Sequence, residues 1–238
     1  MSIDRLFSES DVAPGAFQFD AKVTPVFEDM VTRSVPFYAQ IQASISAFVK
    51  RFSQPDTTVY DLGCSTGVTT FKIRQAVPPS VAVMGLDASD FMIEAASRQF
   101  AECLGLSFDV HDLKEPYPAA PASVVVLNLV LQFVSPQHRS QVLHDWFGRL
   151  VPGGVMILVE KLSLSSDELA PHFMTQYHHF KHQNGYTWAE ISRKQMALEG
   201  VLQPWTFQEN QSLLENTGFT IVESFFRWYN FAGWIGLK

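Results

Sequence analysis

Cysteine is scarce in this sequence of 238 residues, in which only Cys64 and Cys103 occur. Two cysteines cannot form a disulfide framework or, on their own, a metal site, so we expect a protein of the reduced cytoplasm. Runs of like charge are also missing, and the formal net charge is −7. A chain without a basic patch is a poor candidate for general nucleic-acid binding, so we expect no direct nucleic-acid partner.

Long hydrophobic runs are absent as well. The most apolar stretch, Ser123–Val134, is interrupted by Asn128 and Gln132, and it falls short of the roughly 18 apolar residues of a membrane span. The N-terminal residues lack the basic and apolar regions of a signal peptide. Apolar residues nevertheless make up 47% of the chain, which is enough for the core of a single domain over residues 1–238 that includes an insertion.

The most informative stretch is Thr58–Thr70, which reads Thr-Val-Tyr-Asp-Leu-Gly-Cys-Ser-Thr-Gly-Val-Thr-Thr. Its β-branched and aromatic residues at 58–61 predict a strand. Gly63 and Gly67 bracket a tight turn, and Val68–Ala76 is predicted as a helix. A strand, a glycine turn and a helix open the nucleoside-binding half of a doubly wound α/β fold. The glycines let a ligand approach the backbone closely, and the helix N-terminus offers free N–H groups.

An acidic residue follows at the distance that this fold uses for ribose. Asp87 lies twenty residues after Gly67 and ends a second apolar run, Val81–Leu86. It is therefore placed at the tip of the next strand, where it can accept hydrogen bonds from ribose hydroxyls. The alternative is a turn aspartate that caps the helix beginning near Phe91. The glycine loop that precedes Asp87 favours the ribose interpretation.

The loop from Asp61 to Gly67 resembles motif I of the class I methyltransferases, which use S-adenosyl-L-methionine (SAM). That motif usually has a third glycine at the place of Ser65. Asp61 favours SAM over a dinucleotide, because the ammonium and sulfonium groups of SAM are cationic whereas a pyrophosphate would be repelled. Cys64 lies in the same loop without a nearby histidine in the sequence to activate it, so we expect no nucleophilic role for its thiol.

The rest of the chain continues the α/β alternation. The predicted elements are a helix at Phe91–Leu104, strands near Ser107–Val110 and at Ser123–Leu129, a helix at Gln137–Leu150 ended by Pro152-Gly153-Gly154, a strand at Val155–Glu160, a helix at Gln208–Thr217, and a closing hairpin of Thr220–Trp228 and Phe231–Leu237. Asp112 follows the third strand, where this fold usually holds the adenine amino group, and Asn128 ends the fourth strand at the ligand-binding edge. The sequence therefore predicts a seven-stranded Rossmann-like α/β sheet of the class I methyltransferase type with a C-terminal antiparallel hairpin.

Residues 1–55 are predicted as a helical lid. A loose arm is followed by a short amphipathic helix at Asp20–Asp29. Pro36 suits the first turn of a second helix, whose apolar residues continue with helical spacing to Phe52. Because helices that precede the first strand often cover the nucleoside in this fold, we expect Tyr38 to face the pocket.

Residues 164–205 break the alternation and are predicted as an insertion of two or three helices. Its apolar residues are too numerous for a solvated face, so we expect them to meet a second subunit. They are Phe173, Met174, Tyr177 and Phe180. His178 and His182 share one helix face and could hold a metal in principle, but no third ligand is spaced to match, so we expect no metal site.

A closer resemblance covers nearly the whole chain. The residues that carry it are Phe17-Gln18-Phe19-Asp20, Arg33-Ser34-Val35-Pro36, Tyr60-Asp61-Leu62-Gly63-Cys64-Ser65, Val126-Leu127-Asn128, Leu131-Gln132-Phe133, Glu160-Lys161, His178-His179-Phe180-Lys181, Asn184-Gly185-Tyr186 and Glu190-Ile191-Ser192. With these motifs the chain resembles the carboxy-S-adenosyl-L-methionine (carboxy-SAM) synthase family of bacterial tRNA wobble-uridine modification.

The resemblance implies a ligand, a reaction and a partner. The cofactor is SAM or carboxy-SAM, and the positions that match its binding residues are Tyr38, Gly63, Cys64, Ser65, Asp87, Ala88, Asp112, Leu113 and Asn128. Family members convert SAM and prephenate to carboxy-SAM and phenylpyruvate by capturing the carbon dioxide that prephenate releases. They are homodimers, in which an arginine from the insertion of the partner subunit holds the new carboxylate.

Two positions depart from the family pattern. Ala88 stands where the family usually has an asparagine, which removes one side-chain hydrogen bond near the nucleoside. Gln195 stands where the carboxylate-binding arginine belongs, and glutamine offers no charge and no bidentate fork. Arg193 and Lys194 come just before this position and are further candidates for substrate binding, although side chains one or two residues apart on a helix point in different directions.

Two other functions fit the same residues. One is an ordinary SAM-dependent methyltransferase that acts on an unknown small molecule, and the other is a non-catalytic SAM-binding subunit that partners an enzyme. The glycine loop does not separate these from a carboxy-SAM synthase. The sequence assigns no general base, since His111 and Tyr38 are candidates that have equally good packing roles.

Overall fold

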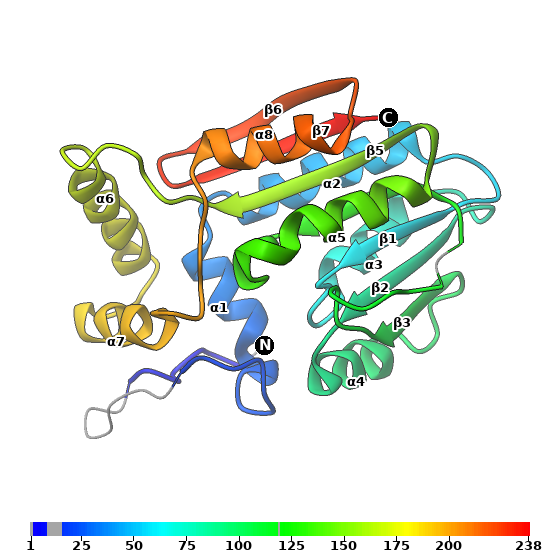
Figure 1. Ribbon diagram of the computed structural model, residues 1–238. Coiled ribbons are helices and arrows are strands. Elements are labelled where there is room, and N and C mark those ends of the chain that lie inside the picture. The colour runs from blue at the N-terminus through cyan, green and yellow to red at the C-terminus, as the bar shows by residue number, and fades with distance from the viewer. Residues whose placement is uncertain (1, 9–15, 119) are drawn as a thin grey trace.

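Seven strands form one sheet in the order β3-β2-β1-β4-β5-β7-β6 in the computed structural model, which describes residues 2–8, 16–118 and 120–238 (Figure 1). The strands are β1 (Thr58–Leu62), β2 (Ala82–Asp87), β3 (Leu106–Val110), β4 (Ala122–Asn128), β5 (Leu150–Lys161), β6 (Ile221–Trp228) and β7 (Phe231–Leu237). The first five run parallel, and β7 pairs antiparallel with both β5 and β6. This topology confirms the predicted class I methyltransferase fold.

Helices cover both faces of the sheet (Figure 1). They are α1 (Phe27–Ser34), α2 (Tyr38–Phe52), α3 (Val68–Ala76), α4 (Asp90–Gln99), α5 (Pro136–Arg149), α6 (Ala170–Gln183), α7 (Trp188–Leu198) and α8 (Phe207–Thr217), with short 3-10 turns η1 (Thr24–Val26) and η2 (Leu131–Phe133). Ile45 of α2 and Ile73 of α3 pack into one core layer, and Leu143 of α5 and Leu214 of α8 pack into the other. None of the described helices is long and apolar enough to span a membrane.

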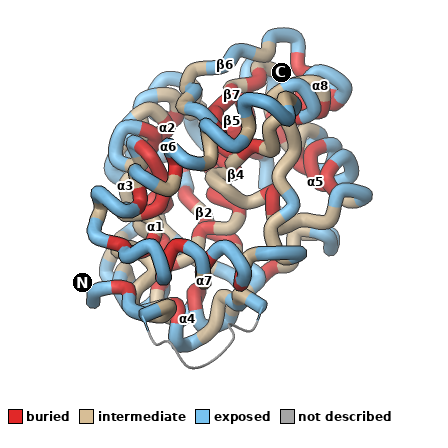
Figure 2. The backbone as a smooth tube through the Cα atoms, turned by 90° about the vertical axis from the view of Figure 1, so that its left-hand side faces the viewer, coloured by how far each residue is buried: buried red, intermediate tan, exposed pale blue. Residues whose placement is uncertain are grey.

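Strand β4 shows why the central strands are nearly all apolar. Val124 and Val126 belong to the core layer of α2 and α3, whereas Val125 and Leu127 belong to the layer of α5 and α8. Because side chains alternate along a strand, a strand with helices on both faces buries all of them. The buried residues accordingly concentrate along the sheet, while the outer helices carry most of the exposed ones (Figure 2).

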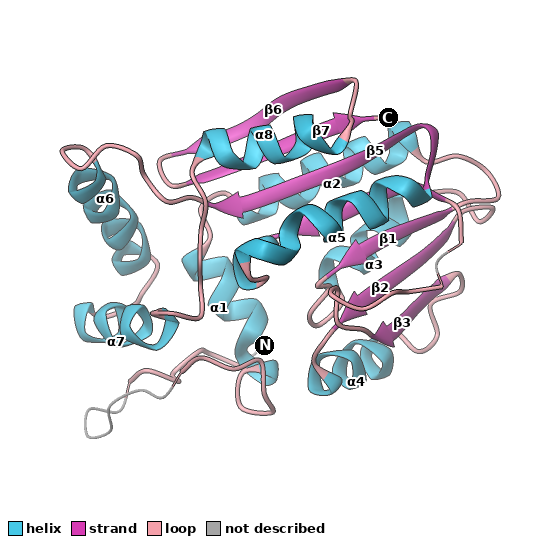
Figure 3. Cartoon of the chain, in the orientation of Figure 1, coloured by secondary structure: helices cyan, strands magenta, loops and turns pink. Residues whose placement is uncertain are grey.

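The parallel strands end at one edge of the sheet. Asp61, Asp87, Asn128 and Lys161 lie at or within one residue of the carboxyl ends of β1, β2, β4 and β5. Helices α1, α6 and α7 stand beside this edge (Figure 3). In open α/β sheets the ligand binds outside the carboxyl ends of the strands, at the point where the strand order reverses. Here that point lies between β1 and β4, so these helices stand beside the edge where the ligand is expected.

Several predicted boundaries are wrong for identifiable reasons. The helix expected to reach Leu104 ends at Gln99, because the backbone leaves the helical conformation at Phe100, whose ring stacks on Phe71 at 4.7 Å. Leu104 is left 93% exposed. Strand β5 begins at Leu150 rather than Val155, since the chain continues pairing through a register shift beside Pro152-Gly153-Gly154.

The N-terminal region also differs in detail from the expectation. A 3-10 turn precedes α1, and α1 continues to Ser34, five residues beyond the predicted end at Asp29. Helix α2 begins at Tyr38 after Phe37, which has a left-handed φ of 55°, so Pro36 lies outside the helix. Residues 1 and 9–15 of the expected lid, including Pro14 and Gly15, lie outside the described residues. The insertion contains two helices, α6 and α7.

Candidate functional site

A cavity of about 700 Å³ opens at the carboxyl edge of the sheet. A volume of this size suits a drug-sized or nucleoside-sized ligand. All nine residues that the sequence analysis assigned to the SAM-type ligand line it, namely Tyr38, Gly63, Cys64, Ser65, Asp87, Ala88, Asp112, Leu113 and Asn128. The structure thus brings together residues from five separate segments of the chain.

The glycine loop fits closely against its neighbours. Gly63 has a φ of 66°, and a Cβ atom built on it would lie 2.5 Å from Cγ2 of Val130. Gly67 has a φ of 78°, and a Cβ atom there would lie 2.7 Å from Phe108. Ser65, at the place of the usual third glycine, also takes a positive φ of 50°. The loop therefore keeps the left-handed backbone that glycine favours, although a serine occupies one of its positions.

Asp87 links the end of β2 to the glycine loop. Its carboxylate accepts a hydrogen bond from the backbone N–H of Ser65 at 2.9 Å and another from the backbone N–H of Ser89 at 2.9 Å. The cap of helix α4 is Ser89, whose hydroxyl accepts from the N–H of Met92, so the alternative role of Asp87 as the helix cap is wrong. Burial raises the pKa of Asp87, while the N–H donors lower it.

Asp61 is the most deeply placed acid of the cavity, at 2% exposure. Its Oδ2 accepts a hydrogen bond of 2.7 Å from the hydroxyl of Thr70. Burial raises the pKa of Asp61 to about 7, and the charge of Asp87 adds to this rise. A cationic group in the cavity would favour the ionised carboxylate, so this acid matches the ammonium or sulfonium of SAM.

Asn128 supplies a second acceptor at the same edge. Its Oδ1 atom is buried and has no hydrogen-bond partner among the described residues. An unpaired buried acceptor costs free energy unless a ligand or an ordered water donates to it. Together with Asp61, this atom shows that the residues present fit a ligand that carries N–H donors and a positive charge.

The two candidate bases differ in protonation. Burial raises the pKa of Tyr38 to about 12, although a hydrogen bond with Thr69 opposes the rise, so its phenol stays protonated and is a donor. Burial lowers the pKa of His111, and its ring lies 4.9 Å from that of Tyr117 with Nε2 buried and unpaired within the described chain. A neutral His111 can accept a proton. It lies beside Asp112 at the β3 end of the cavity, whereas Asp61 and Asn128 lie at the ends of β1 and β4.

The end of β5 carries site residues that the sequence analysis left without a role. The Glu160 carboxylate accepts hydrogen bonds of 3.0, 2.8 and 2.9 Å from the backbone N–H groups of residues 130–132, which hold the loop after β4 against the cavity. Burial raises the pKa of Glu160 to about 8, and those N–H groups act in the opposite direction. The next residue, Lys161, lines the cavity, as does Tyr177 of α6. The family motif Glu160-Lys161 at a strand end was the available signal.

The three expected substrate-binding residues do not stay together. Lys194 is 7% exposed and lines the cavity of its own chain. Arg193 turns toward the N-terminal segment and donates a hydrogen bond of 2.6 Å to the carbonyl of Phe7. Gln195 is exposed on the outer side of α7. Of these three residues, Lys194 alone lines the cavity.

Two further expectations concern metals and thiols. No group of three or more His, Cys, Asp or Glu side chains within the described ranges could hold a metal ion. His182 donates a hydrogen bond of 2.8 Å from Nδ1 to the backbone carbonyl of Tyr186. Cys64 is 6% exposed, and burial raises the pKa of its thiol. A thiol that is buried and protonated is a poor nucleophile.

Two solved structures with the same fold are methyltransferases with SAM or SAH bound. Human N-acetylserotonin methyltransferase in complex with SAM superposes with a TM-score of 0.64 and 16% identity, covering 91% of this chain and 55% of that chain. Magnesium protoporphyrin IX methyltransferase from Synechocystis with bound SAH superposes with a TM-score of 0.61 and 16% identity, covering 88% and 87%. At this identity the likeness shows the fold alone.

Sequence comparison is more specific. Residues 59–154 match the family described as a methyltransferase domain. The carboxy-SAM synthase of Methylococcus capsulatus is 38% identical over 244 aligned positions, covering 100% of both chains. That of Trichlorobacter lovleyi is 40% identical over 227 positions, covering 93% of each. With its SAM-type cavity and its methyltransferase fold, the chain belongs to the carboxy-S-adenosyl-L-methionine synthase family of SAM-dependent transferases.

Proposed function

We propose that the protein makes carboxy-SAM from SAM and prephenate. The observation that carries this proposal is that one cavity is lined by all nine residues matched to the family's ligand-binding positions. The same cavity extends to Lys161 at the end of β5 and Lys194 of α7, so there is room and positive charge beside the nucleoside site. An ordinary methyltransferase acting on a neutral molecule would have no use for these buried cations.

Each part of SAM has a matching group. Asp87 would accept from the ribose hydroxyls, Asp112 and Leu113 would hold the nucleobase, and Asp61 with Asn128 would face the cationic amino-acid end. The strand order β3-β2-β1-β4 supports this assignment, because it runs from Asp112 and Leu113 after β3, through Asp87 on β2, to Asp61 on β1 and Asn128 on β4. SAM itself would supply a methyl carbon made acidic by the neighbouring sulfonium.

The stoichiometry of the reaction explains why the cavity offers no clear general base. Prephenate becomes phenylpyruvate by losing carbon dioxide and a hydroxide ion, and carboxylation of the SAM methyl releases one proton. The proton and the hydroxide leave as water, so the balance requires no proton acceptor on the protein. The protonated phenol of Tyr38 and the distant His111 are consistent with this view. The residues of the chain would then bind and orient two ligands and exclude bulk water.

The test is product formation with defined substrates. Purified protein is incubated with SAM and prephenate, and carboxy-SAM and phenylpyruvate are measured by mass spectrometry, together with any ligand that copurifies. We expect both products in equal amounts, and neither when prephenate is left out. If SAM is consumed without carboxy-SAM, or if only methylated products form with added acceptors, the proposed reaction is wrong.

We also propose a homodimer, working in the cytoplasm within tRNA wobble-uridine modification. The sequence analysis based the dimer on four apolar residues of the insertion, but Tyr177 is 7% exposed and packs on Phe231 with ring centroids 5.3 Å apart. The other three are half-buried, and Leu169, Trp188 and Met196 of the insertion are 52%, 49% and 51% exposed, so apolar side chains remain available to a second subunit. Light scattering at micromolar concentration should give twice the chain mass, and a monomer would contradict the dimer.

A further inference from the structure

A half-buried lysine on helix α3 lines the cavity without an anionic partner. The Nζ atom of Lys72 donates a hydrogen bond of 2.5 Å to Oε1 of Gln42 on α2. Glu28 and Asp61 line the same cavity, but Lys72 forms no ion pair with either of them or with any other described acid. Of the three N–H donors that a lysine ammonium has, the described chain uses one.

Gln42 is a polar residue within an apolar stripe. Ile45 and Val49 follow it by three and seven residues on the buried face of α2, and Gln42 is itself 3% exposed. A buried amide is costly unless it is hydrogen-bonded. Here the amide oxygen accepts from Lys72, and Nε2 donates to the hydroxyl of Thr69 at 3.0 Å. Gln42 therefore holds the Lys72 ammonium at the cavity wall.

The first turn of α3 carries two hydrogen-bond systems side by side. Thr69 belongs to the system that ends in the Lys72 ammonium. The next residue, Thr70, donates to the carboxylate of Asp61 at 2.7 Å. Lys72 follows Thr69 by three residues and so shares its helix face. A cationic and an anionic side chain thus reach the cavity beside the same turn, directly after the glycine loop.

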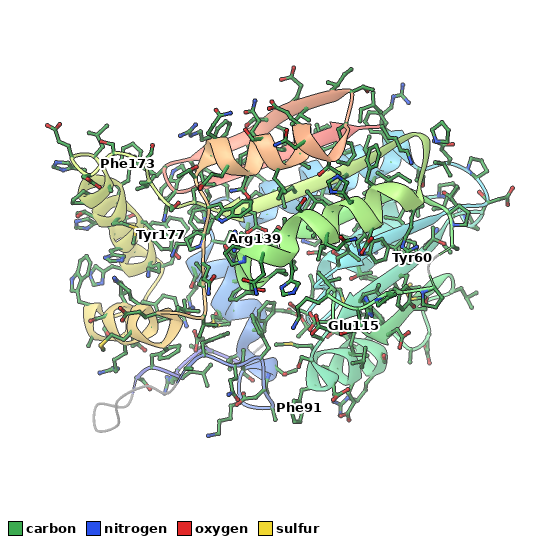
Figure 4. The ribbon with its side chains drawn as sticks, viewed as in Figure 1. Tyr60, Phe91, Glu115, Arg139, Phe173 and Tyr177 are labelled. Carbon is green, nitrogen blue, oxygen red and sulfur yellow. The ribbon has the colours of Figure 1, made fainter. Side chains whose placement is uncertain are left out.

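Strand β1 brings Asp61 to the side of the sheet on which α3 lies. Tyr60 points to the opposite side, where its ring lies 4.9 Å from that of Trp146 on α5 (Figure 4). Because side chains alternate along a strand, Asp61 faces the layer of α2 and α3, in agreement with its hydrogen bond from Thr70. Asp61 and Lys72 therefore lie on the same side of the sheet.

The ligand proposed for this cavity carries one charge that has no partner yet. SAM has a sulfonium, an ammonium and a carboxylate. Asp61 and Asn128 match the cationic groups and Asp87 matches the ribose, which leaves the carboxylate. The ammonium and the carboxylate of an α-amino acid are attached to one carbon atom, so a site for both needs an anionic and a cationic side chain close together. Asp61 and Lys72 have this composition.

We infer that Lys72, held by Gln42, binds the α-carboxylate of SAM. The free N–H donors of its ammonium allow charge-assisted hydrogen bonds to that group. The inference rests on the proposed placement of SAM in the cavity, and it is independent of the reaction at the methyl group. Lys72 is then a specificity-determining residue, which distinguishes a ligand with the carboxylate from one without it, and Gln42 is a positioning residue.

The other lysines of the cavity are less suited to this role. Lys114 pairs with Asp112 at 3.0 Å beside β3, and Lys194 lies 4.0 Å from Asp4. Lys161 ends β5, which is two strand spacings from β1, or roughly 10 Å. Lys72 is on the helix that directly follows β1 and the glycine loop.

The test compares SAM with decarboxylated SAM, which keeps the ammonium and the sulfonium and lacks only the carboxylate. Calorimetry measures the affinity of both ligands for the wild type, Lys72→Met, Lys72→Arg and Gln42→Leu. Methionine keeps a long unbranched side chain and removes the charge, whereas arginine keeps the charge. Lys50→Met, exposed on the neighbouring α2, is the matched control. Methylthioadenosine, which lacks the whole amino-acid part, checks that the nucleoside part remains intact.

We expect the wild type and Lys50→Met to bind SAM about 10- to 100-fold more tightly than decarboxylated SAM. The preference should fall to within about threefold in Lys72→Met, persist in Lys72→Arg and decrease in Gln42→Leu, with unchanged affinity for methylthioadenosine throughout. Decarboxylated SAM has the greater positive charge, and Asp61, Asp87 and Glu28 line the cavity. Without Lys72, loss of the carboxylate should therefore not weaken binding.

Equal affinity for the two ligands in the wild type, or the full preference in Lys72→Met, would overturn the role of Lys72. The full preference in Gln42→Leu would overturn the positioning role of Gln42. Lys72→Gln takes the place of Lys72→Met if the methionine variant does not fold.

Product formation separates this inference from the proposed reaction. A preference for SAM that depends on Lys72, in a protein that forms no carboxy-SAM, would refute the reaction and leave the role of Lys72 standing. Formation of carboxy-SAM by a wild type that binds the two ligands equally would refute the role of Lys72 and leave the reaction standing.

Discussion

Replacing Asp61 by asparagine tests whether a buried carboxyl of the cavity is tuned for a cationic ligand. Asp61 is 2% exposed and accepts a hydrogen bond from Thr70, and burial raises its pKa to about 7. Asparagine has nearly the same shape. It keeps a carbonyl acceptor for the Thr70 hydroxyl and removes both the charge and the titration. Any difference between the two proteins that depends on pH therefore reports the ionisation of this one group.

The magnitude follows from the difference between the folded and unfolded pKa. The ordinary value of 3.8 applies to the unfolded chain, and the folded protein without ligand has a value of about 7. Between these values the folded state holds a proton that the unfolded state has released, so the free energy of unfolding falls as the pH rises. At about 1.36 kcal/mol per pKa unit, the full loss is about 4 kcal/mol, of which about 3 kcal/mol falls between pH 5 and pH 8.

The assay is urea unfolding of the wild type and Asp61→Asn without ligand at pH 5 and pH 8. We expect the variant to gain about 3 kcal/mol relative to the wild type between the two pH values, because only the wild type loses stability through this carboxyl. At pH 7.5, SAM should bind the variant about 10- to 100-fold more weakly, since a charged acceptor is lost. Asp145→Asn, exposed on α5, is the control. A stability difference that is the same at both pH values, or an unchanged SAM affinity, would refute the reasoning.

Three further predictions address other parts of the site. Asp87→Ala should weaken SAM binding by about 10- to 100-fold in calorimetry, through loss of a charged acceptor, and unchanged affinity in a folded variant would remove its ribose role. Gly63→Ala should lower the free energy of unfolding by about 1–3 kcal/mol, because φ is 66° and the new Cβ would lie 2.5 Å from Val130; an unchanged Tm would contradict this. Gln195→Arg should raise the preference for carboxy-SAM over SAM by about 10- to 100-fold if the guanidinium reaches the carboxylate. Mass spectrometry of the copurified ligand checks that outcome, and an unchanged preference would contradict a carboxylate-binding role for this position.

Much of the fold and of the ligand cavity was predictable because both depend on local signals. The glycine turn at Gly63 and Gly67 and the spacing to Asp87 define a strand, a turn and a strand end. Parallel strands joined by helices must end at the same edge of the sheet, so Asp61, Asp87 and Asn128 could be placed side by side without coordinates. The family resemblance, not the local pattern, added Ala88 and Leu113, and all nine assigned residues line one cavity.

The far end of the cavity depends on contacts that no local pattern encodes. Lys161, Lys181 and Lys194 are separated by 20 and 13 residues along the chain, and they meet only because α6 and α7 fold back beside the end of β5. Asp4 reaches the same region from the N-terminal segment through a hydrogen bond of 2.5 Å from the hydroxyl of Tyr186. The sequence shows that the three lysines are present, but no local pattern predicts the tertiary contacts that bring them together.

Helix α7 shows that the choice of which helix face points to the interior changes the functional conclusion. Ile191 and Ala197 are buried at 2% exposure, and Lys194 lies three residues from each, so all three share one helix face. Gln195 is rotated about 100° from Lys194 and is exposed. Reading the family position alone directs attention to the neutral glutamine, whereas the spacing of the buried residues points to the lysine. A lysine that continues an apolar stripe must either find an anion in the interior or lose its charge. For Lys194 that anion is Asp4, whose Oδ2 lies 4.0 Å from Nζ, so the N-terminal segment stabilises the position of α7.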